Sequence, residues 1–281
     1  MEIRRTLIDA EALRALLDAG RPLVVLDCGF DLARPEAGLA AYRQGHVPGA
    51  RYADLDRDLA GAKTGRNGRH PLPAREVFAA TMSRWGVGPG TQVVCYDDQG
   101  GPYAARAWWM HRWMGHEATA VLDGGLAAWR GAGGALETGD AADVPPATSP
   151  TRSPAMSVIE ADELLAALGR VRVLDARAGE RFRGEVETLD PVAGHIPGAT
   201  LRFFKDNLQP DGRFKPAEQL RREFAALGAL DGTPVVHQCG SGVTACHNLL
   251  AMAHAGLDAG RLYPGSWSEW CADPSRPVAV G

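Results

Sequence analysis

The stretch PVVHQCGSGVTACHNLLAMAHAG, residues 234–256, decides the fold of this chain. It opens with the β-branched residues Val235 and Val236, which predict the end of a buried strand. A loop of small residues follows at 239–244, and the mostly apolar run 245–255 predicts a helix that stops at Gly256. A strand, a short loop and a helix in this order indicate a parallel α/β sheet, in which ligands bind at the carboxyl ends of the strands.

Cys239, the first residue of this loop, is a candidate nucleophile. Gly240 and Gly242 let the backbone curl so that successive N–H groups point inward, and the first turn of the helix adds further unpaired donors. A thiol in such a place ionises more readily than an ordinary cysteine, and the thiolate is the reactive form. The alternative is a buried and inert thiol, because free cysteine is often a core residue. A Gly-x-Gly loop between strand and helix favours the nucleophile.

The composition is that expected of an ordinary soluble globular protein. The 281 residues are 45% hydrophobic and 23% charged, and the formal net charge of −4 gives no indication of nucleic-acid binding. No apolar run reaches the roughly 20 residues that span a bilayer, and no signal-peptide pattern is present at the N-terminus. Five cysteines spread over the chain argue against a disulfide framework and for a reducing, cytoplasmic compartment.

The two halves of the sequence resemble each other. Each opens with an amphipathic helix pattern and continues with a short buried strand that ends in aspartate, Asp27 in the first half and Asp175 in the second. The turn Gly-His-x-Pro-Gly-Ala then occurs at 45–50 and again at 194–199. Later landmarks are 141 positions apart, namely Val94 and Val235, Gly115 and Gly256, Gly124 and Gly265, and Trp129 and Trp270. A duplicated domain explains this constant spacing.

We therefore predict an α/β protein of two tandem domains, each an open parallel sheet with helices on both faces. The first domain is expected at 1–130 and the second, catalytic domain at 155–281. The segment 131–154 between them is rich in Gly, Pro and Ala without an apolar period, so we expect a surface linker. With the same offset of 141, Asp98 takes the place of Cys239, which predicts that the first domain is an inactive copy.

The tandem halves, the two Gly-His-x-Pro-Gly-Ala turns, the segments GGLAAW (124–129) and GSWSEW (265–270), and above all CGSGVTAC (239–246) resemble the two-domain rhodanese family of sulfurtransferases. The resemblance covers nearly the whole chain. Family members with a CRKGVT-like loop are typically thiosulfate sulfurtransferases, whereas CGSGVT resembles the 3-mercaptopyruvate enzymes. The resemblance implies that Cys239 takes sulfur from a small donor as a persulfide and passes it to cyanide or to a thiol such as thioredoxin. It implies no cofactor and no metal.

The loop residues themselves agree with this chemistry. A persulfide intermediate needs a thiolate, a cradle of N–H donors and no bulky group over the sulfur. Those requirements are met by Cys239 followed by Gly240, Ser241, Gly242, Val243 and Thr244. The loop carries no basic pair that would favour the thiosulfate dianion, whereas the single carboxylate of mercaptopyruvate can be held by an arginine at its edge.

Two arginines follow the second strand that ends in aspartate. Arg181 matches a carboxylate-binding residue of the mercaptopyruvate enzymes, and the alternative is a surface arginine that pairs with Glu180 or Glu185. Those enzymes usually carry a second arginine about six positions before the Gly-His turn, where this chain has Thr188. Either Arg183 substitutes for it, or the enzyme prefers thiosulfate or another small donor.

His46 matches a first-domain histidine that the family associates with a relay to a hydroxyl. Ser241 would supply the hydroxyl, and an acid near Asp31 or Glu36 would complete the relay. A histidine before Pro-Gly can equally be structural and bond its own loop. His195 occupies the duplicate position and has no evident chemistry.

Other kinds of site fit the same stretch less well. A cysteine phosphatase needs an arginine six residues after its cysteine, and that residue is Ala245. A nucleotide P-loop would require a lysine that the loop lacks. A zinc site would combine His237, Cys239, Cys246 and His247, but Cys246 lies in the predicted helix and is expected in the core. A sulfur carrier or regulatory module without turnover remains the alternative from another class.

Overall fold

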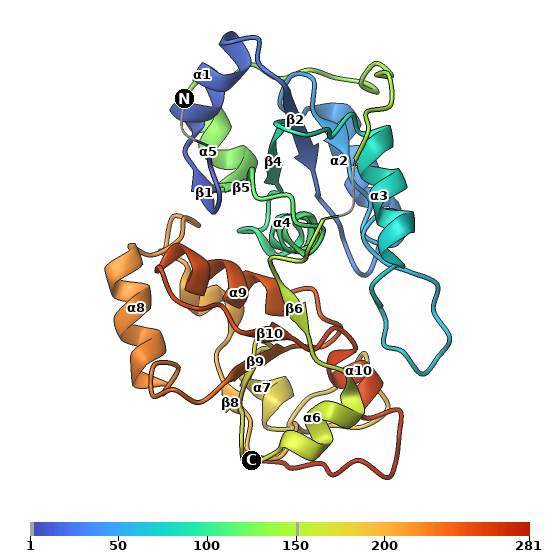
Figure 1. The fold of residues 1–281 in the computed structure, drawn as a ribbon, viewed down its shortest axis with the longest axis vertical. Helices are drawn as coiled ribbons and strands as arrows, with labels where there is room; N and C mark the ends of the chain where they lie inside the picture. Colours follow the sequence, from blue (N-terminus) through green and yellow to red (C-terminus); the bar gives the residue numbers. More distant parts are fainter. Residues whose placement is uncertain (1–2, 150–151) are drawn as a thin grey trace. The chain divides into compact units, whose positions relative to one another are not determined.

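The computed structural model describes residues 3–149 and 152–281, which form two compact units (Figure 1). The first unit comprises the chain up to Gly61 together with Pro73–Ala155 and Pro210–Arg213. The second comprises Ala62–Leu72, Met156–Gln209 and Phe214–Gly281. Residues 62–72 therefore pack with the second unit although they lie far upstream of its other residues, and this placement adds two side chains to the candidate site.

Each unit contains a sheet of five parallel strands, and the two sheets have the same topology. The strand order is β1-β5-β4-β2-β3 in the first unit and β6-β10-β9-β7-β8 in the second. The strands of the first sheet are β1 Leu7–Ile8, β2 Leu23–Asp27, β3 Arg51–Tyr52, β4 Gln92–Tyr96 and β5 Thr119–Leu122. Those of the second are β6 Ser157–Val158, β7 Arg172–Asp175, β8 Thr200–Leu201, β9 Val235–Gln238 and β10 Arg261–Leu262. The common order confirms the duplication.

Helices cover the sheets between the strands. In the first unit they are α1 Ala10–Asp18, α2 Glu36–Gln44, α3 Arg75–Arg84, α4 Pro102–Trp113 and α5 Gly125–Gly131. In the second unit they are α6 Ala161–Ala167, α7 Gly179–Phe182, the 3-10 helix η1 Phe204–Asn207, α8 Ala217–Ala226, α9 Ala245–His254 and α10 Ser266–Trp270. No helix within the described ranges is long and apolar enough to cross a membrane.

Alternation along the strands places a core on each face of the sheet. In the first unit Val25 and Val94 pack with Leu13 of α1 and Trp129 of α5, while α4 packs against β4 and β5. In the second unit Val236 packs with the tryptophans of α10, while α9 packs against β9 and β10. The predicted fold class, two tandem open parallel sheets with helices on both faces, is confirmed.

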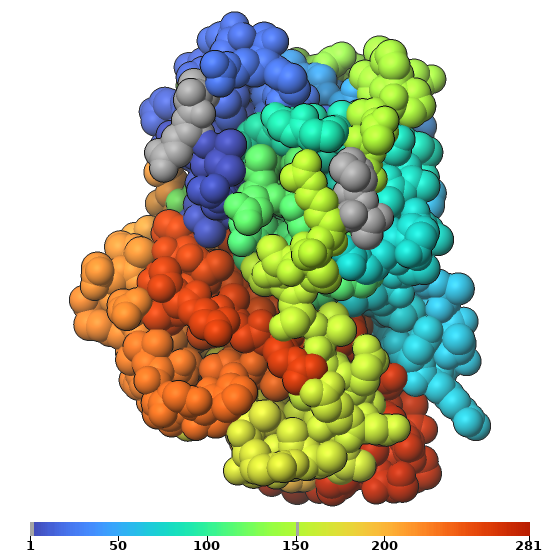
Figure 2. All heavy atoms as spheres, viewed as in Figure 1, coloured from blue at the N-terminus to red at the C-terminus, as the bar shows by residue number. Residues whose placement is uncertain are grey.

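The segment that follows α5 contains neither helix nor strand up to residue 149. Its yellow-green atoms run over the surface of the first unit (Figure 2). The backbone of Glu137 pairs with that of His46, and the N–H of Ala147 donates to the carbonyl of Ser83 at 3.1 Å. The segment is therefore fastened to the first unit along its length.

Candidate active site

Cys239 directly follows β9 and is 1% exposed. Its N–H donates to Ser266 Oγ at 3.0 Å, and its carbonyl accepts from the N–H of Trp267 at 2.9 Å. Ser266 and Trp267 begin α10, so this helix anchors the backbone on both sides of the cysteine. The loop 239–244 then leads into α9, which begins at Ala245 as predicted.

Gly242 makes the turn of this loop possible. Its φ is +75°, a conformation that residues with a side chain rarely adopt. A Cβ at this position would lie 2.3 Å from the carbonyl oxygen of Pro264. Gly242 is therefore required both by backbone conformation and by the close approach of another segment.

The counterpart of Cys239 in the first unit is Asp97, and the prediction of Asp98 is wrong by one residue. Asp27 of β2 pairs with Tyr96, just as Asp175 of β7 pairs with Gln238, so the next residue in each case is Asp97 or Cys239. The carbonyl of Asp97 accepts from Leu126 at 3.2 Å, the equivalent of the bond between Cys239 and Trp267. From this position to the glycine that follows the next helix, the first unit has one more residue than the second (Asp97 to Gly115 against Cys239 to Gly256), so the offset of 141 fails at the loop.

The carboxylate of Asp97 fills its own loop. It is 1% exposed and accepts hydrogen bonds of 2.8–3.1 Å from the backbone N–H groups of Gln99, Gly101, Tyr103 and Ala104. Burial raises the pKa of the Asp97 carboxyl, although these four donors act to lower it.

In the second unit three N–H groups of the corresponding loop are not used by the residues that the structure describes. Within the described residues, no acceptor is found for the N–H groups of Ser241, Val243 and Thr244. Because Cys239 takes the position of Asp97, its sulfur lies where the first unit holds a carboxylate. The loop can therefore stabilise a negative charge on the Cys239 sulfur or on a group bound to it.

Ser241 is paired with a histidine that the sequence analysis missed. His70 Nδ1 lies 2.8 Å from Ser241 Oγ, and both side chains are buried. His70 belongs to the segment 62–72 that packs with the second unit. Gly68, Arg69, His70 and Pro71 do form a short polar motif in the sequence, but nothing local indicates which unit it joins.

His46 has the surroundings of a structural histidine. Its ring is fully buried, stacks on Tyr42 at 4.0 Å, and has Nδ1 2.8 Å from the Tyr42 carbonyl. His195, the duplicate, stacks on Phe182 at 3.9 Å with Nδ1 2.8 Å from the Phe182 carbonyl. The two Gly-His turns are therefore built alike.

Among the described residues, neither acid predicted to complete a relay with His46 contacts its ring. Asp31 pairs with Arg34 at 3.0 Å instead, and Glu36 begins α2 without a bond to His46. The acid nearest to His46 is Glu137, 3.9 Å from Nε2. The hydroxyl of Ser241 lies within hydrogen-bond distance of His70 Nδ1.

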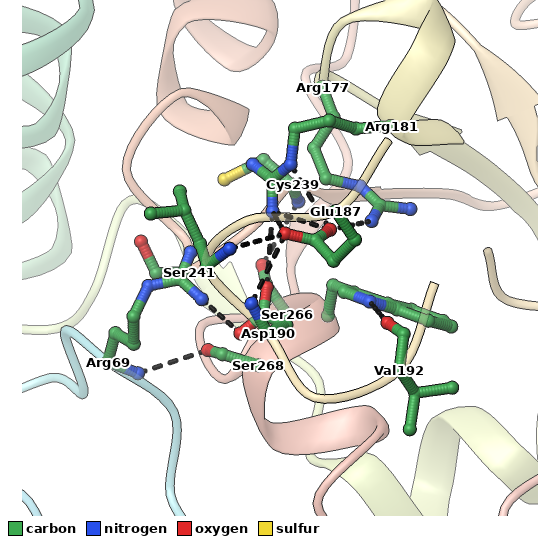
Figure 3. Close-up of polar contacts among 12 residues, drawn as sticks. Arg69, Arg177, Arg181, Glu187, Asp190, Val192, Cys239, Ser241, Ser266 and Ser268 are labelled. Carbon is green, nitrogen blue, oxygen red and sulfur yellow. Dashed lines mark hydrogen bonds and ion pairs between the residues drawn. The ribbon is translucent and has the colours of Figure 1, made fainter. Parts of the chain in front are cut away.

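Two guanidinium groups face the loop next to Cys239. A Cβ at Gly240 would lie 2.8 Å from Arg69 Nη2 and 3.3 Å from Arg181 Nη1. Asp190 pairs with both arginines, and Glu187 binds Arg181 at 2.8 Å (Figure 3). The N–H of Arg69 also donates to Ser268 Oγ at 3.0 Å.

The two acids of this cluster are each 3% exposed in their side chains. Burial raises the pKa of the Glu187 carboxyl, but its bonds to Arg181 and to the N–H groups of Leu189 and Asp190 lower it more, so the pKa lies below its ordinary value. Glu187 is thus an ionised partner that holds Arg181 in place, and Asp190 pairs with both arginines.

Arg183 does not belong to this cluster. Its side chain is 44% exposed and pairs with Glu185 at 2.7 Å. The second cation expected near the loop comes from Arg69, more than a hundred positions upstream, and not from Arg183 or from the position of Thr188.

Comparison with known proteins agrees with this geometry. A family model described as a rhodanese-like domain matches residues 9–132 and again 160–273. The chain belongs to the rhodanese family of sulfurtransferases. It is 51% identical over 282 residues, 98% of each chain, to a probable 3-mercaptopyruvate sulfurtransferase of Pseudomonas aeruginosa.

Two further relatives describe the range of this likeness. The rhodanese is 41% identical over 290 residues to the putative thiosulfate sulfurtransferase SseB of Mycobacterium tuberculosis, covering 99% of this chain and 98% of that one. The solved structure of 3-mercaptopyruvate sulfurtransferase from Leishmania major superimposes with a TM-score of 0.84 at 31% identity, covering 95% of this chain and 74% of that one.

The described part of this rhodanese contains no group of three or more His, Cys, Asp and Glu side chains that could hold a metal. Cys246 is fully buried in α9, with Sγ 3.3 Å from the Gly242 carbonyl, as the core assignment predicted. His237 is fully buried in β9, and burial lowers its pKa to about 3. Cys246 and His237 therefore belong to the core of the second unit.

Proposed function

We propose that this rhodanese transfers sulfur from 3-mercaptopyruvate, through a persulfide on Cys239, to a thiol or to cyanide. The observation that carries this proposal is the contrast between the two loops. The N–H donors around Asp97 bind its carboxylate, whereas those of Ser241, Val243 and Thr244 in the Cys239 loop have no acceptor in the described chain. N–H groups without an acceptor next to one cysteine can stabilise its sulfur while the charge and the substituent of that sulfur change during a reaction.

The first step breaks the carbon–sulfur bond of the donor. The Cys239 thiolate attacks the donor sulfur, and a sulfur–sulfur bond forms as the bonding pair of the carbon–sulfur bond moves to the donor carbon. The products are the Cys239 persulfide and the enolate of pyruvate, which takes up a proton to give pyruvate. An acceptor thiolate then attacks the outer sulfur and leaves Cys239 as thiolate again.

Arg181 and Arg69 are the proposed binding groups for the donor carboxylate. Both guanidinium groups face Gly240, the residue after the nucleophile, and Asp190 lies between them. Guanidinium groups bind carboxylates through paired N–H donors. A side chain at residue 240 would collide with them, so Gly240 and the arginines form one binding edge.

Ser241 and His70 are proposed to transfer the proton that converts the enolate to pyruvate. The hydroxyl of Ser241 lies within the loop, and His70 at 2.8 Å can accept or return its proton. A hydroxyl here can stabilise the enolate oxygen and supply the proton that completes pyruvate. This role was predicted for His46 and is proposed for His70.

The acceptor is proposed to be a small thiol or a dithiol protein such as thioredoxin. All five cysteines are free thiols in the structure, which suits a reducing compartment such as the cytoplasm. The persulfide and the acceptor are inferences from chemistry and from the family.

A steady-state comparison of donors tests the proposal, with Cys239→Ser and Cys246→Ser as a matched pair. Wild-type protein should release pyruvate from 3-mercaptopyruvate repeatedly when a dithiol is present. Cys239→Ser should lose this turnover, whereas Cys246→Ser should keep most of it because Cys246 is packed in α9. For wild type and both variants, the measured quantity is the amount of pyruvate formed per chain.

Three outcomes would contradict the proposal. Turnover with thiosulfate but not with mercaptopyruvate would make thiosulfate the donor. That donor is the one in the name of the relative from Mycobacterium tuberculosis. A single release of pyruvate per chain would indicate a carrier. Equal loss from both cysteine variants would remove the special role of Cys239.

A further inference from the structure

A cavity of about 500 Å³ lies in the first unit, at the carboxyl ends of β2 and β4. Its lining residues come entirely from the first unit, from the ends of these strands, from α2 and from α5. Its buried lining residues are Asp27, Phe30, Gly38, Tyr42, Gly45 and Tyr96, and Leu126 lies at its side. We call it the Asp27 cavity. Its volume is in the range of pockets that hold small molecules.

The second unit shows what occupies the corresponding space there. The guanidinium of Arg177 is 1% exposed and binds the carboxylate of Asp175 at 2.8–3.2 Å through two nitrogens. It also donates to the carbonyl of Gly194 at 2.8 Å and lies over the ring of Trp267, 4.8 Å from its centroid. The carboxylate of Glu187 lies 3.7 Å from Arg177 Nη1. The site thus places two carboxylates, a carbonyl and an aromatic face around one guanidinium.

Three of these partners, Asp175, Gly194 and Trp267, have counterparts that line the Asp27 cavity. Asp175 corresponds to Asp27 at the end of the equivalent strand, and Gly194 corresponds to Gly45 in the duplicated Gly-His turn. Trp267 corresponds to Leu126, because both donate their N–H to the residue at the nucleophile position.

The guanidinium itself has no counterpart. Gly29 stands where the second unit has Arg177, since the N–H of each donates to its aspartate Oδ1 at 2.9 Å. The first unit keeps three of the partners of the Arg177 guanidinium and lacks the side chain that carries it.

Asp27 is left buried without a cation. It is 6% exposed, and no ion pair to it is formed by the described residues. Burial raises its pKa to about 6, and the neighbouring Asp97 and Asp98 act in the same direction, against hydrogen bonds from Gly29 and Tyr96 that lower it. The Gly45 carbonyl likewise receives no donor within the described chain. A buried carboxylate and a free carbonyl together are strong acceptors.

The rim of the cavity carries charges of both signs. Arg34 is neutralised by Asp31 at 3.0 Å, and Asp98 and Arg130 are exposed. The charges of the rim therefore do not select a ligand, and the buried groups of the cavity do.

We propose that the Asp27 cavity binds a small molecule with an alkylguanidinium group, whose planar fork donates to the Asp27 carboxylate and to the Gly45 carbonyl as Arg177 does in the second unit. A guanidinium fits better than an ammonium, because two parallel N–H groups match the carboxylate while a third reaches the carbonyl. The alkyl chain runs past Leu126 toward the rim. The site is independent of the sulfur transfer proposed for Cys239.

Isothermal titration with n-butylguanidine at pH 8 tests this directly, and n-butylurea serves as the neutral probe of the same shape. We expect one site per chain for butylguanidine and at least about tenfold weaker binding of butylurea. Asp27→Asn should weaken butylguanidine binding by at least about tenfold, because it removes the charge and keeps the shape. Asp98→Asn removes an equal charge from the rim and should change the affinity by less than about threefold.

Gly29→Arg is the sharpest variant. It supplies in the chain the guanidinium that the first unit lacks, so it should abolish butylguanidine binding without lowering the melting temperature. If Gly29→Arg does not fold, Asp27→Asn and the urea probe still decide. Equal binding of butylguanidine and butylurea, unchanged affinity in Asp27→Asn, or no binding of butylguanidine at millimolar concentration would overturn the proposal. Sulfur transfer by Gly29→Arg should remain at the wild-type rate, which separates this test from that of Cys239.

Discussion

The hydrogen bond between Ser241 Oγ and His70 Nδ1 joins residues 171 positions apart and is the contact on which the proposed proton transfer depends. A hydroxyl next to a buried histidine can give up its proton and receive it back without water. Neither residue is exposed, so the pair is also protected from competing hydrogen bonds.

Replacement of His70 by alanine should lower kcat with 3-mercaptopyruvate by roughly 10²- to 10⁴-fold, the usual contribution of a positioned acid or base. Steady-state kinetics measure this, together with alkylation of Cys239 to show that the thiol is still accessible to reagent. The effect should be in kcat, because His70 is assigned to the chemical step and not to binding of the carboxylate.

His46→Gln is the matched control for that variant. Because His46 stacks on Tyr42 and bonds its carbonyl, its replacement should lower the melting temperature and leave kcat close to wild type. If His46→Gln lost as much kcat as His70→Ala while remaining folded, the original assignment to His46 would be restored.

Arg181 and Arg183 form a second matched pair, two positions apart in sequence. Arg181→Ala should raise the KM for mercaptopyruvate by at least about tenfold, because it removes one of the guanidinium groups that face Gly240. Arg183→Ala should leave KM nearly unchanged, since this side chain pairs with Glu185 at the surface. Equal KM values for both variants would remove Arg181 from the donor site.

The loop between β9 and α9 is the element whose conformation the site depends on most. Its glycine at 242 combines a positive φ with a backbone oxygen at 2.3 Å from the position of a Cβ. Gly256, at the end of α9, has φ +68° but open space around its Cβ position. The two glycines therefore separate the effect of backbone conformation from the effect of a collision.

Urea unfolding of Gly242→Ala and Gly256→Ala would measure both effects. Gly256→Ala should lower the free energy of unfolding by about 1–2 kcal/mol, the value for a left-handed residue with a Cβ. Gly242→Ala should lower it by more than that, because the Pro264 segment must move. It should also impair sulfur transfer, whereas Gly256→Ala should not. Similar destabilisation of the two variants would show that the loop and the Pro264 segment move apart at little cost in free energy.

The strands at one edge of each sheet are the elements that sequence patterns did not reveal. β1 and β6 contain two residues each and pair with β5 and β10. Two residues cannot show an alternating period, so the sequence predicts no strand before α1. In the structure Asp9 is the N-cap, and its Oδ1 accepts from the N–H of Ala12 at 2.7 Å.

The stability of the whole molecule should depend on pH through Asp27. Its pKa in the folded chain is about 6, above the ordinary value of 3.8, so the folded state binds this proton more tightly than the unfolded state. The free energy of unfolding should therefore fall as pH rises from about 4 to about 6, by on the order of 1–3 kcal/mol from this group. Urea titrations at several pH values would show this fall in wild type and its absence in Asp27→Asn.

Glu223 provides a control of opposite sign. Its bonds to Lys215, Arg202 and Gln219 outweigh the effect of burial and lower its pKa to about 2, so the stability that it contributes is present above about pH 4.5 and is lost as pH falls toward 2. Glu223→Gln should change the acid side of the curve and leave the fall between pH 4 and 6 in place. If Asp27→Asn left that fall unchanged, Asp27 would not be its source.

The sequence by itself determined the features that depend on neighbouring residues. The strand, loop and helix around Cys239, the amphipathic helix that opens each half, and the duplication are all predicted from period, small residues and spacing. These patterns work because alternation and turn chemistry act within a few residues, and because a parallel sheet repeats one local unit.

Only the tertiary structure decided which distant residues complete the site. Arg69 and His70 lie in a segment without apolar period, and their contacts with Asp190 and Ser241 depend on the sheet against which that segment packs. The one-residue shift that makes Asp97 the counterpart of Cys239 is likewise set by strand register and not by constant spacing. Such contacts arise from the packing of segments far apart in the chain, where the energy comes from burial and pairing that no local pattern encodes.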